Sequence, residues 1–507
     1  MGYLFCFSQS PQKTTYLQIV TNLAQTCRLE LSFSSDLVNL NDSTDFVFST
    51  DPDSCLIQVQ MLAGLKITKT ANHLIILPEA PELIHLQGLV IDSQTKEPLP
   101  YAHLIIKTSG IGTITNKDGL FDFKIQGHYA QNEITFSFLG YSNKSYKIPF
   151  TDTDSLVIEM VAKPYTLSDI YVLPNGTEAV DIVKRAVKNI KRNYHRNAVQ
   201  MDAFYRSTSF RDTTPSQLIE AALLIEDKGI NKPIQTTSIK LQQVRKSSNY
   251  LIPQNKKWEL LEKAWGHRNM FFRALGRNIV RYYREDWWYK PLTDYKTFKY
   301  EFEGFEWLDS VKVYKIKFIY DHLWPNGQRA SENKNAENAG YIFINADDWG
   351  ILKVEQWCKL YGNFANKYAF KDGYISKNEI VYQKLNGKYY LKFTSGFTLP
   401  DGELFIFENP DAPDREKIIK ERQWAEDVLL VTNIITERKK FDKIKYREKL
   451  ARDENSYKKI YPYNSAFWKN YNILKENPVE EKLINSLEWE KPLDQQFQEN
   501  SSNDAGN

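Results

Sequence analysis

Short segments that alternate between apolar and polar residues fill the stretch from residue 85 to residue 160. Successive side chains of a strand point to opposite faces, so this alternation predicts strands with one buried face. A turn at Asn116, Asp118 and Gly119 leads into Phe121 and Phe123, which return to the interior. The stretch therefore predicts a small antiparallel β-sandwich over residues 85–162, with an apolar face carried by Leu89, Ile91, Ala102, Leu104 and Ile106.

Three local motifs in this stretch carry a family resemblance. They are G-x-V-x-D at residues 88–92, P-L-x-x-A at residues 98–102 and T-x-x-D-G-x-F at residues 115–121. Together they resemble the carboxypeptidase-regulatory-like (transthyretin-like) domain found near the amino end of many Bacteroidetes envelope proteins. The resemblance implies a fold and an exported protein, and it implies no reaction.

The composition favours a β-rich protein of several domains. A chain of 507 residues is too long for one ordinary core. Tyr, Phe and Trp number 30, 28 and 11 against 5 Met, and aromatic side chains suit pleated, half-buried surfaces. The net charge of +3 gives no argument for a nucleic-acid partner.

The cysteines and the amino end bear on the compartment. Cys27 and Cys55 either pair within one small domain or remain two buried thiols, and the chain has no C-x-x-C motif. Residues 1–13 begin with an apolar run, interpreted as the remnant of a secretory signal peptide, with an N-terminal strand as the alternative. Nowhere are there ~18 consecutive uncharged apolar residues for a spanning helix, so the mature chain is expected to be soluble or peripheral.

Residues 14–80 predict a small α+β module. A helix is expected over Tyr16–Cys27, and a second one capped by Ser54 is expected to run through Leu62. Strands are expected at residues 29–33 and 46–48, with a hairpin over residues 68–77. This β-α-β arrangement resembles the short secretin and TonB N-terminal domain, through Leu-x-Phe-Ser at residues 31–34 and the closing His73-Leu-Ile-Ile-Leu77. The resemblance implies a module that contacts protein partners in the periplasm.

Residues 176–440 predict a large, curved antiparallel sheet. An amphipathic helix is expected over residues 178–194, after an exit strand of the sandwich at residues 165–172, and another helix is expected near 267–284. The predicted shape is a half-barrel, compared at the level of fold with periplasmic lipoprotein carriers. The expected strands include residues 311–320, 340–344, 351–359 and 428–436, and a hairpin of residues 379–385 and 388–393 around Asn386-Gly387.

The carboxyl end differs in composition from the rest. Residues 441–498 are dense in charge and predict a partly helical extension. Residues 499–507 form a polar tail that is expected to be disordered. The fold class expected for the whole chain is multidomain and mainly β with some α: a small α+β module, a β-sandwich and a half-barrel.

Motifs for catalysis or metal binding are not recognisable. The seven histidines lack the H-x-x-E or H-E-x-x-H spacing of zinc peptidases, and no G-x-S-x-G appears. The G-x-G at residues 110–112 lies in a β-turn without a following helix, which argues against phosphate binding. Asp347 and Asp348 are interpreted as turn residues beside Trp349-Gly350. No cofactor, no metal and no catalytic residue is predicted.

One arginine-rich segment is the speculative binding site. Arg273, Arg277 and Arg281 recur at i, i+4 and i+8, and Trp287 and Trp288 follow. Such a ridge beside aromatic rings suits an acidic partner or a lipid head group. The alternative is a solvated helix face over a packed apolar stripe, with the tryptophans in the core.

These patterns predict a non-enzymatic periplasmic accessory protein that works by protein contact. The expected partner is an outer-membrane β-barrel protein or its complex, such as a TonB-dependent transporter or a barrel-assembly or secretion complex, and no nucleic acid is involved. A carrier that shelters lipid in the half-barrel is one alternative. A hydrolase with an unrecognised site is the other.

Overall fold

The chain forms two compact units in a computed structural model, and each is described here by itself. The structure describes residues 12–33, 43–46, 51–63, 65–78, 82–107, 109–163, 178–211, 214–248, 270–283, 290–308, 311–322, 329–362, 373–398, 423–451, 462–476, 481, 485, 487–488 and 491–502. The first unit contains residues up to Ile84 with 125–132 and 147–152, and the second contains the remainder.

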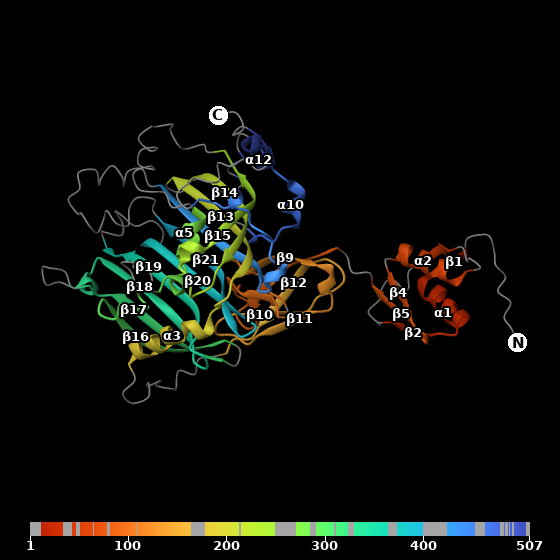
Figure 1. Ribbon diagram of the computed structural model, residues 1–507, viewed down its shortest axis with the longest axis horizontal. Coiled ribbons are helices and arrows are strands. Elements are labelled where there is room, and N and C mark those ends of the chain that lie inside the picture. Colours follow the sequence, from red (N-terminus) through yellow and green to blue (C-terminus); the bar gives the residue numbers. More distant parts are fainter. Residues whose placement is uncertain are drawn as a thin grey trace. The chain divides into compact units, whose positions relative to one another are not determined.

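Most of the first unit is a small α+β module (Figure 1). Helix α1 spans Tyr16–Cys27 as predicted, and a capping box between Thr15 and Gln18 begins it. Strands β2 and β4 flank β5 in one sheet, while β1 pairs with β3. The remaining bounds are β1 Gln12–Thr15, β2 Glu30–Phe33, β3 Ser43–Phe46, α2 Pro52–Ala63, β4 Leu65–Lys69 and β5 His73–Pro78.

Three details of this unit differ from expectation or decide between alternatives. Asp51, not Ser54, caps α2, since the Asp51 carboxylate accepts hydrogen bonds from both the amide and the hydroxyl of Ser54. Strand β3 spans Ser43–Phe46 and overlaps the strand expected at residues 46–48 at Phe46, while residues 47–48 lie outside the described residues. Cys27 and Cys55 are free thiols, so the disulfide alternative is not realised.

The sandwich of the second unit consists of two sheets, in the orders β11-β10-β7-β8 and β12-β6-β9. Phe121 and Phe123 are fully buried, and Phe121 meets Phe136 edge to face at 5.7 Å. The expectation of a purely antiparallel sandwich is wrong in one place, because β12 runs parallel to β6. The bounds are β6 Leu83–Asp92, β7 His103–Ile106, β8 Gly112–Ile114, β9 Leu120–Gln126, β10 Glu133–Ser137, β11 Lys144–Lys147 and β12 Thr153–Met160.

Ten strands form the large predicted sheet, in the order β15-β14-β13-β22-β21-β20-β19-β18-β17-β16, with every neighbouring pair antiparallel (Figure 1). Asn386 and Gly387 both have positive φ, as the predicted two-residue turn between β20 and β21 requires. The bounds are β13 Val199–Arg211, β14 Thr214–Asp227, β15 Ser238–Lys246, β16 Phe298–Leu308, β17 Val311–Tyr320, β18 Ala336–Asn345, β19 Ile351–Leu360, β20 Tyr374–Leu385, β21 Lys388–Thr398 and β22 Gln423–Ile435. The predicted fold class is confirmed.

Both faces of this sheet are covered. On one, the helix face, α3 (Ala179–Asn193), α5 (Met270–Gly276) and α6 (Ile279–Tyr282) pack against inward side chains such as Tyr205 and Ile316. On the other, the sandwich face, Ile114 of β8 packs in one cluster with Phe204, Phe393 and Leu430. The sandwich is therefore docked on the sheet, and Lys117 forms an ion pair with Glu426 across the junction at 2.5 Å.

The carboxyl-terminal extension also packs on the sandwich face. Its helices are α10 (Ser465–Asn470) and α12 (Leu493–Ser502), and Trp468 joins the cluster around Phe204. The side-chain amide of Asn472 bonds both the N–H and the C=O of Lys124, each at 2.8 Å. The tail expected to be disordered from residue 499 is helical through Ser502, and residues 503–507 lie outside the described residues.

Several predictions fall wholly or partly on residues that the structure does not describe, among them residues 1–11 of the signal remnant, residues 47–48 of the strand expected at 46–48, and the exit strand at 165–172. Among the described helices, none is both long and apolar enough to cross a membrane.

Candidate functional site

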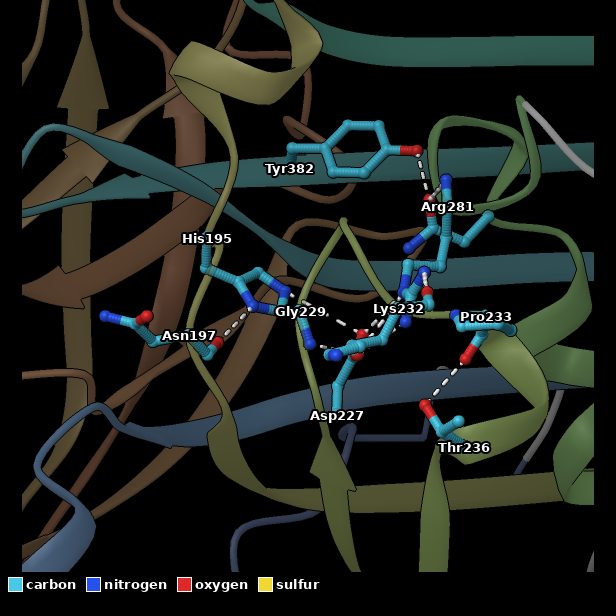
Figure 2. A network of polar contacts seen from close by, with 10 residues as sticks. His195, Asn197, Asp227, Gly229, Lys232, Pro233, Thr236, Arg281 and Tyr382 are labelled. Atoms are coloured by element: carbon cyan, nitrogen blue, oxygen red, sulfur yellow. Dashed lines mark hydrogen bonds and ion pairs between the residues drawn. The ribbon is translucent and has the colours of Figure 1, made fainter.

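A buried polar network lies where β14 ends on the helix face of the sheet (Figure 2). The last residue of β14 is Asp227, and Gly229 turns the chain immediately afterwards with a φ of 98°. The Gly229 amide donates to the Asp227 carboxylate at 2.9 Å. The turn and the strand end therefore fix the carboxylate in the interior of the protein.

Arg281 of α6 pairs with this carboxylate. Its Nε and Nη2 lie 3.0 and 2.9 Å from the two carboxylate oxygens, and its Nη1 donates to the Lys232 carbonyl at 2.6 Å. Both side chains are at least 90% buried. Burial alone raises the pKa of Asp227, but His195 and Arg281 outweigh it and hold that pKa below its usual value. Both groups of the pair are therefore ionised, and each neutralises the charge of the other.

His195 lies on the other side of the same carboxylate. Its Nε2 is 3.8 Å from Asp227, its Nδ1 is 3.2 Å from the Asn197 carbonyl, and its ring stacks on Tyr390. Burial lowers the pKa of His195, and the attraction of Asp227 only partly offsets that effect. His195 is consequently neutral near pH 7, with Nδ1–H as the group able to donate to the carbonyl.

A cavity of about 30 Å³ lies beside the network. Arg281, Thr237 and Tyr382 contribute to its lining. The Thr237 hydroxyl is buried and has no hydrogen-bond partner among the described residues, whereas the Tyr382 hydroxyl donates to Asn278 at 2.7 Å. A space of this size holds two or three water molecules, each needing roughly 10–15 Å³.

A second buried arginine pair anchors the preceding helix. Arg277 binds Asp427 of β22 in a bidentate pair at 2.6 and 2.7 Å, and its Nε donates to the side chain of Asn378 at 2.9 Å. Two strands and two consecutive helical segments are thus joined by Arg–Asp pairs. The chemistry of this site is ionic clamping of α5 and α6 onto the sheet.

The structure separates the arginines predicted to share one ridge. Arg273 is exposed on α5, whereas Arg277 and Arg281 are buried. The expected helix near 267–284 ends at Gly276 and begins again at Ile279, because the Asn278 side chain caps α6 through the Arg281 amide. Arg277 and Arg281 are therefore not a solvated helix face, and Trp287 and Trp288 lie outside the described residues.

Sequence reasoning missed the acidic partners and the histidine. Asp227 and Asp427 each stand at one end of an apolar strand segment, which is the available signal for a buried charge. Asp347 and Asp348 occupy the predicted turn. In this turn the Asn345 side-chain oxygen accepts a hydrogen bond from the Asp347 amide at 2.8 Å. No group of three acidic, His or Cys side chains suited to a metal ion occurs among the described residues.

Comparison with known proteins supports one domain of the chain. Residues 86–172 match the family described as CarboxypepD_reg-like domain, which confirms the resemblance for that segment. No curated protein matches this sequence.

Solved structures of low similarity cover about half of the chain. A DUF1329 family protein from Desulfovibrio piger is 11% identical, with 51% of this chain and 93% of that chain covered and a TM-score of 0.20. A putative outer membrane lipoprotein-sorting protein domain from Vibrio parahaemolyticus is 9% identical, with 52% and 96% covered and a TM-score of 0.21. A LolA superfamily protein from Nitrosomonas europaea is 10% identical, with 53% and 99% covered and a TM-score of 0.20. Similarity at this level carries no argument about function.

Proposed function

We propose that this protein is a non-enzymatic, exported accessory protein that works by contact with another envelope protein. The observation that carries the proposal is that both buried carboxylates of this site are already paired with arginines: Asp227 with Arg281, and Asp427 with Arg277. A general base must reach the proton that it removes, and a carboxylate in a bidentate arginine pair is already occupied. The ionic groups of this site serve the fold.

The size of the cavity beside the network supports the same proposal. Ligand pockets usually enclose ~300–1,000 Å³, whereas this cavity measures about 30 Å³. On the helix face, the space in front of the strands is taken by buried side chains of α3 and α5, such as Ile190 and Phe271. We therefore propose that the protein recognises its partner through its surface.

The first unit offers such a surface. Phe33 of β2 is 43% exposed and Ile57 of α2 is 54% exposed, whereas Ile19, Val20 and Val59 of the same module are buried in its core. Strand β2 stands at the end of its three-stranded sheet. An extended segment of a partner can pair with such an edge while apolar side chains anchor it. The partner proposed is an outer-membrane β-barrel protein or its complex.

Affinity capture from detergent-solubilised outer membranes of the source cell tests the proposal. The full chain is expected to recover an integral outer-membrane protein, and a Phe33→Ser/Ile57→Ser variant is expected to lose at least tenfold of it. Val157→Ser/Val161→Ser is the matched control, because these two side chains are 54% and 55% exposed on the sandwich. Recovery of the wild-type chain alone would overturn the proposal.

The same purification separates this proposal from a lipid carrier. A carrier needs an apolar cavity and is expected to retain lipid in a fixed molar ratio after detergent exchange. Organic extraction followed by mass spectrometry measures that ratio. Lipid bound in equal numbers to the protein would favour the carrier over the accessory protein.

A further inference from the structure

Helix α3 presents one strongly basic face to solvent. Lys184, Arg185, Lys188, Lys191 and Arg192 are all exposed, whereas the opposite side buries Ile182, Val183, Ala186 and Ile190. At 3.6 residues per turn the five cations fall within an arc of about 120°. The acidic residues of this helix, Glu178 and Asp181, stand at its amino end, which is where the helix dipole favours them.

Most of this charge is not neutralised by the protein. Lys184 pairs with Asp181, and the Arg185 guanidinium lies 5.3 Å from the centre of the Trp349 ring. The side chains of Lys188, Lys191 and Arg192 form no ion pair or hydrogen bond with any residue in the described ranges. Elsewhere in the chain, buried and half-buried cations such as Lys353 and Lys317 are paired with glutamates.

Two neighbouring residues extend the basic face beyond the carboxyl end of α3. Arg196 is exposed just after the helix, and Lys388, at the start of β21, donates through Nζ to the Arg192 carbonyl. These residues and the five cations of the helix are called the α3 basic face. Figure 1 shows α3 beside β16, which it contacts.

We infer that the α3 basic face binds the surface of an anionic phospholipid bilayer. A protein partner would need an apolar centre that becomes buried in the interface. The large apolar side chains that are exposed among the described residues are Phe33, Ile57, Val157, Val161, Tyr361 and Tyr446, and none belongs to this face. A bilayer carrying anionic head groups requires only a row of cations, each of which contributes roughly fivefold to binding.

The aromatic rings beneath the cations fit this inference. Trp349 lies under Arg185, and Tyr295 lies 5.5 Å from the Lys184 ammonium group. Both rings are half-buried, so they hold the long side chains in place without inserting into the bilayer. Binding is consequently electrostatic, shallow and reversible, and it weakens as salt screens the charges.

Vesicle co-sedimentation of the full chain tests the inference. Vesicles of phosphatidylcholine mixed with phosphatidylglycerol are expected to sediment the protein at about 50 mM salt, and to release most of it at about 500 mM. Vesicles of phosphatidylcholine alone are expected not to bind. Failure to bind the anionic vesicles at low salt would overturn the inference.

Charge reversal locates the binding face. Lys188→Glu/Lys191→Glu is expected to weaken vesicle binding at least tenfold, while Lys107→Glu/Lys144→Glu changes the net charge equally on exposed residues of the sandwich and is expected to leave binding nearly unchanged. Equal losses in the two variants would contradict the assignment to α3. Matching melting temperatures show that both variants are folded. The inference is independent of the accessory function, because the first unit is unaltered.

Discussion

At the scale of single residues, the second unit is distinguished by charges that it buries in closed pairs. Arg281 belongs to α6 and Arg277 directly follows α5, yet their partners lie 54 and 150 residues away in the sequence. Removing two charged groups from water costs several kcal/mol per ion. The attraction between them offsets this cost only when the pair has good geometry and its remaining hydrogen bonds are made. The pairs therefore fix where the helices sit and add little net stability.

Removing one member of a pair is expected to be costly. Asp227→Ala leaves Arg281 buried with the Lys232 carbonyl as its remaining acceptor, so the free energy of unfolding should fall by roughly 3–5 kcal/mol. The double variant Asp227→Leu/Arg281→Met removes both charges and should lose clearly less. Urea denaturation measures both values. A single variant that loses under about 1 kcal/mol would show that the pair is solvated.

Lys392 is also buried, but its hydrogen-bond acceptor is a neutral backbone carbonyl. It is fully buried on the sandwich face of β21, and its Nζ donates to the Val431 carbonyl at 2.7 Å. Burial lowers its pKa from 10.5 to about 7. The neighbouring His103 is neutral at pH 7, because burial and the Lys392 charge lower the pKa of His103 to about 3.

The pKa of Lys392 predicts a pH dependence of stability. Because the folded-state pKa lies below the unfolded value, the unfolded chain binds more protons between pH 10.5 and 7, and stability falls as pH decreases through that range. Lys392→Met should raise the free energy of unfolding by roughly 2–4 kcal/mol at pH 7 and by little near pH 10. Denaturation at both pH values measures the difference. A gain that is independent of pH would contradict a neutral, buried lysine.

At the scale of elements, the regular patterns were predictable and the interruptions were not. The helical period of Tyr16–Cys27 and the Asn386-Gly387 turn gave α1 and the β20–β21 hairpin, because both depend on local chemistry. The break between α5 and α6 depends on Asn278, whose side chain caps the new helix. The arginines on either side of it pair with Asp427 and Asp227 of the sheet, far away in the sequence. The parallel pairing of β12 likewise depends on where the chain returns to the sandwich.

The docking of the sandwich on the sheet explains the G-x-G of residues 110–112. A Cβ on Gly110 would lie 2.2 Å from the Ile434 carbonyl oxygen, so this glycine permits close approach of two backbones. Gly110→Ala should therefore lower the melting temperature by several degrees. Gly276→Ala is the control, since its nearest new contact is an ordinary 3.4 Å from the Tyr282 hydroxyl. Calorimetry that finds the same melting temperature for both variants would contradict the close docking.

At the scale of the whole molecule, the chain combines a small module that exposes apolar side chains with a larger unit whose parts are packed together. Sandwich, sheet and carboxyl-terminal extension share the cluster around Phe204, Ile114 and Trp468. The sequence predicted these regions as separate segments, since contacts such as that between Asn472 and Lys124 join residues far apart in the chain. The parts of the second unit thus pack into one body, and the first unit carries the proposed partner contact.

Site-specific photo-crosslinking in living cells tests the central claim most directly. A photoreactive amino acid is placed at Ile57 in the first unit, and, as the control, at Tyr446, which is 91% exposed in the second unit. The account predicts one covalent adduct from position 57 that contains an integral outer-membrane protein, and no such adduct from position 446. Absence of an adduct at position 57, or the same adduct from both positions, would contradict it.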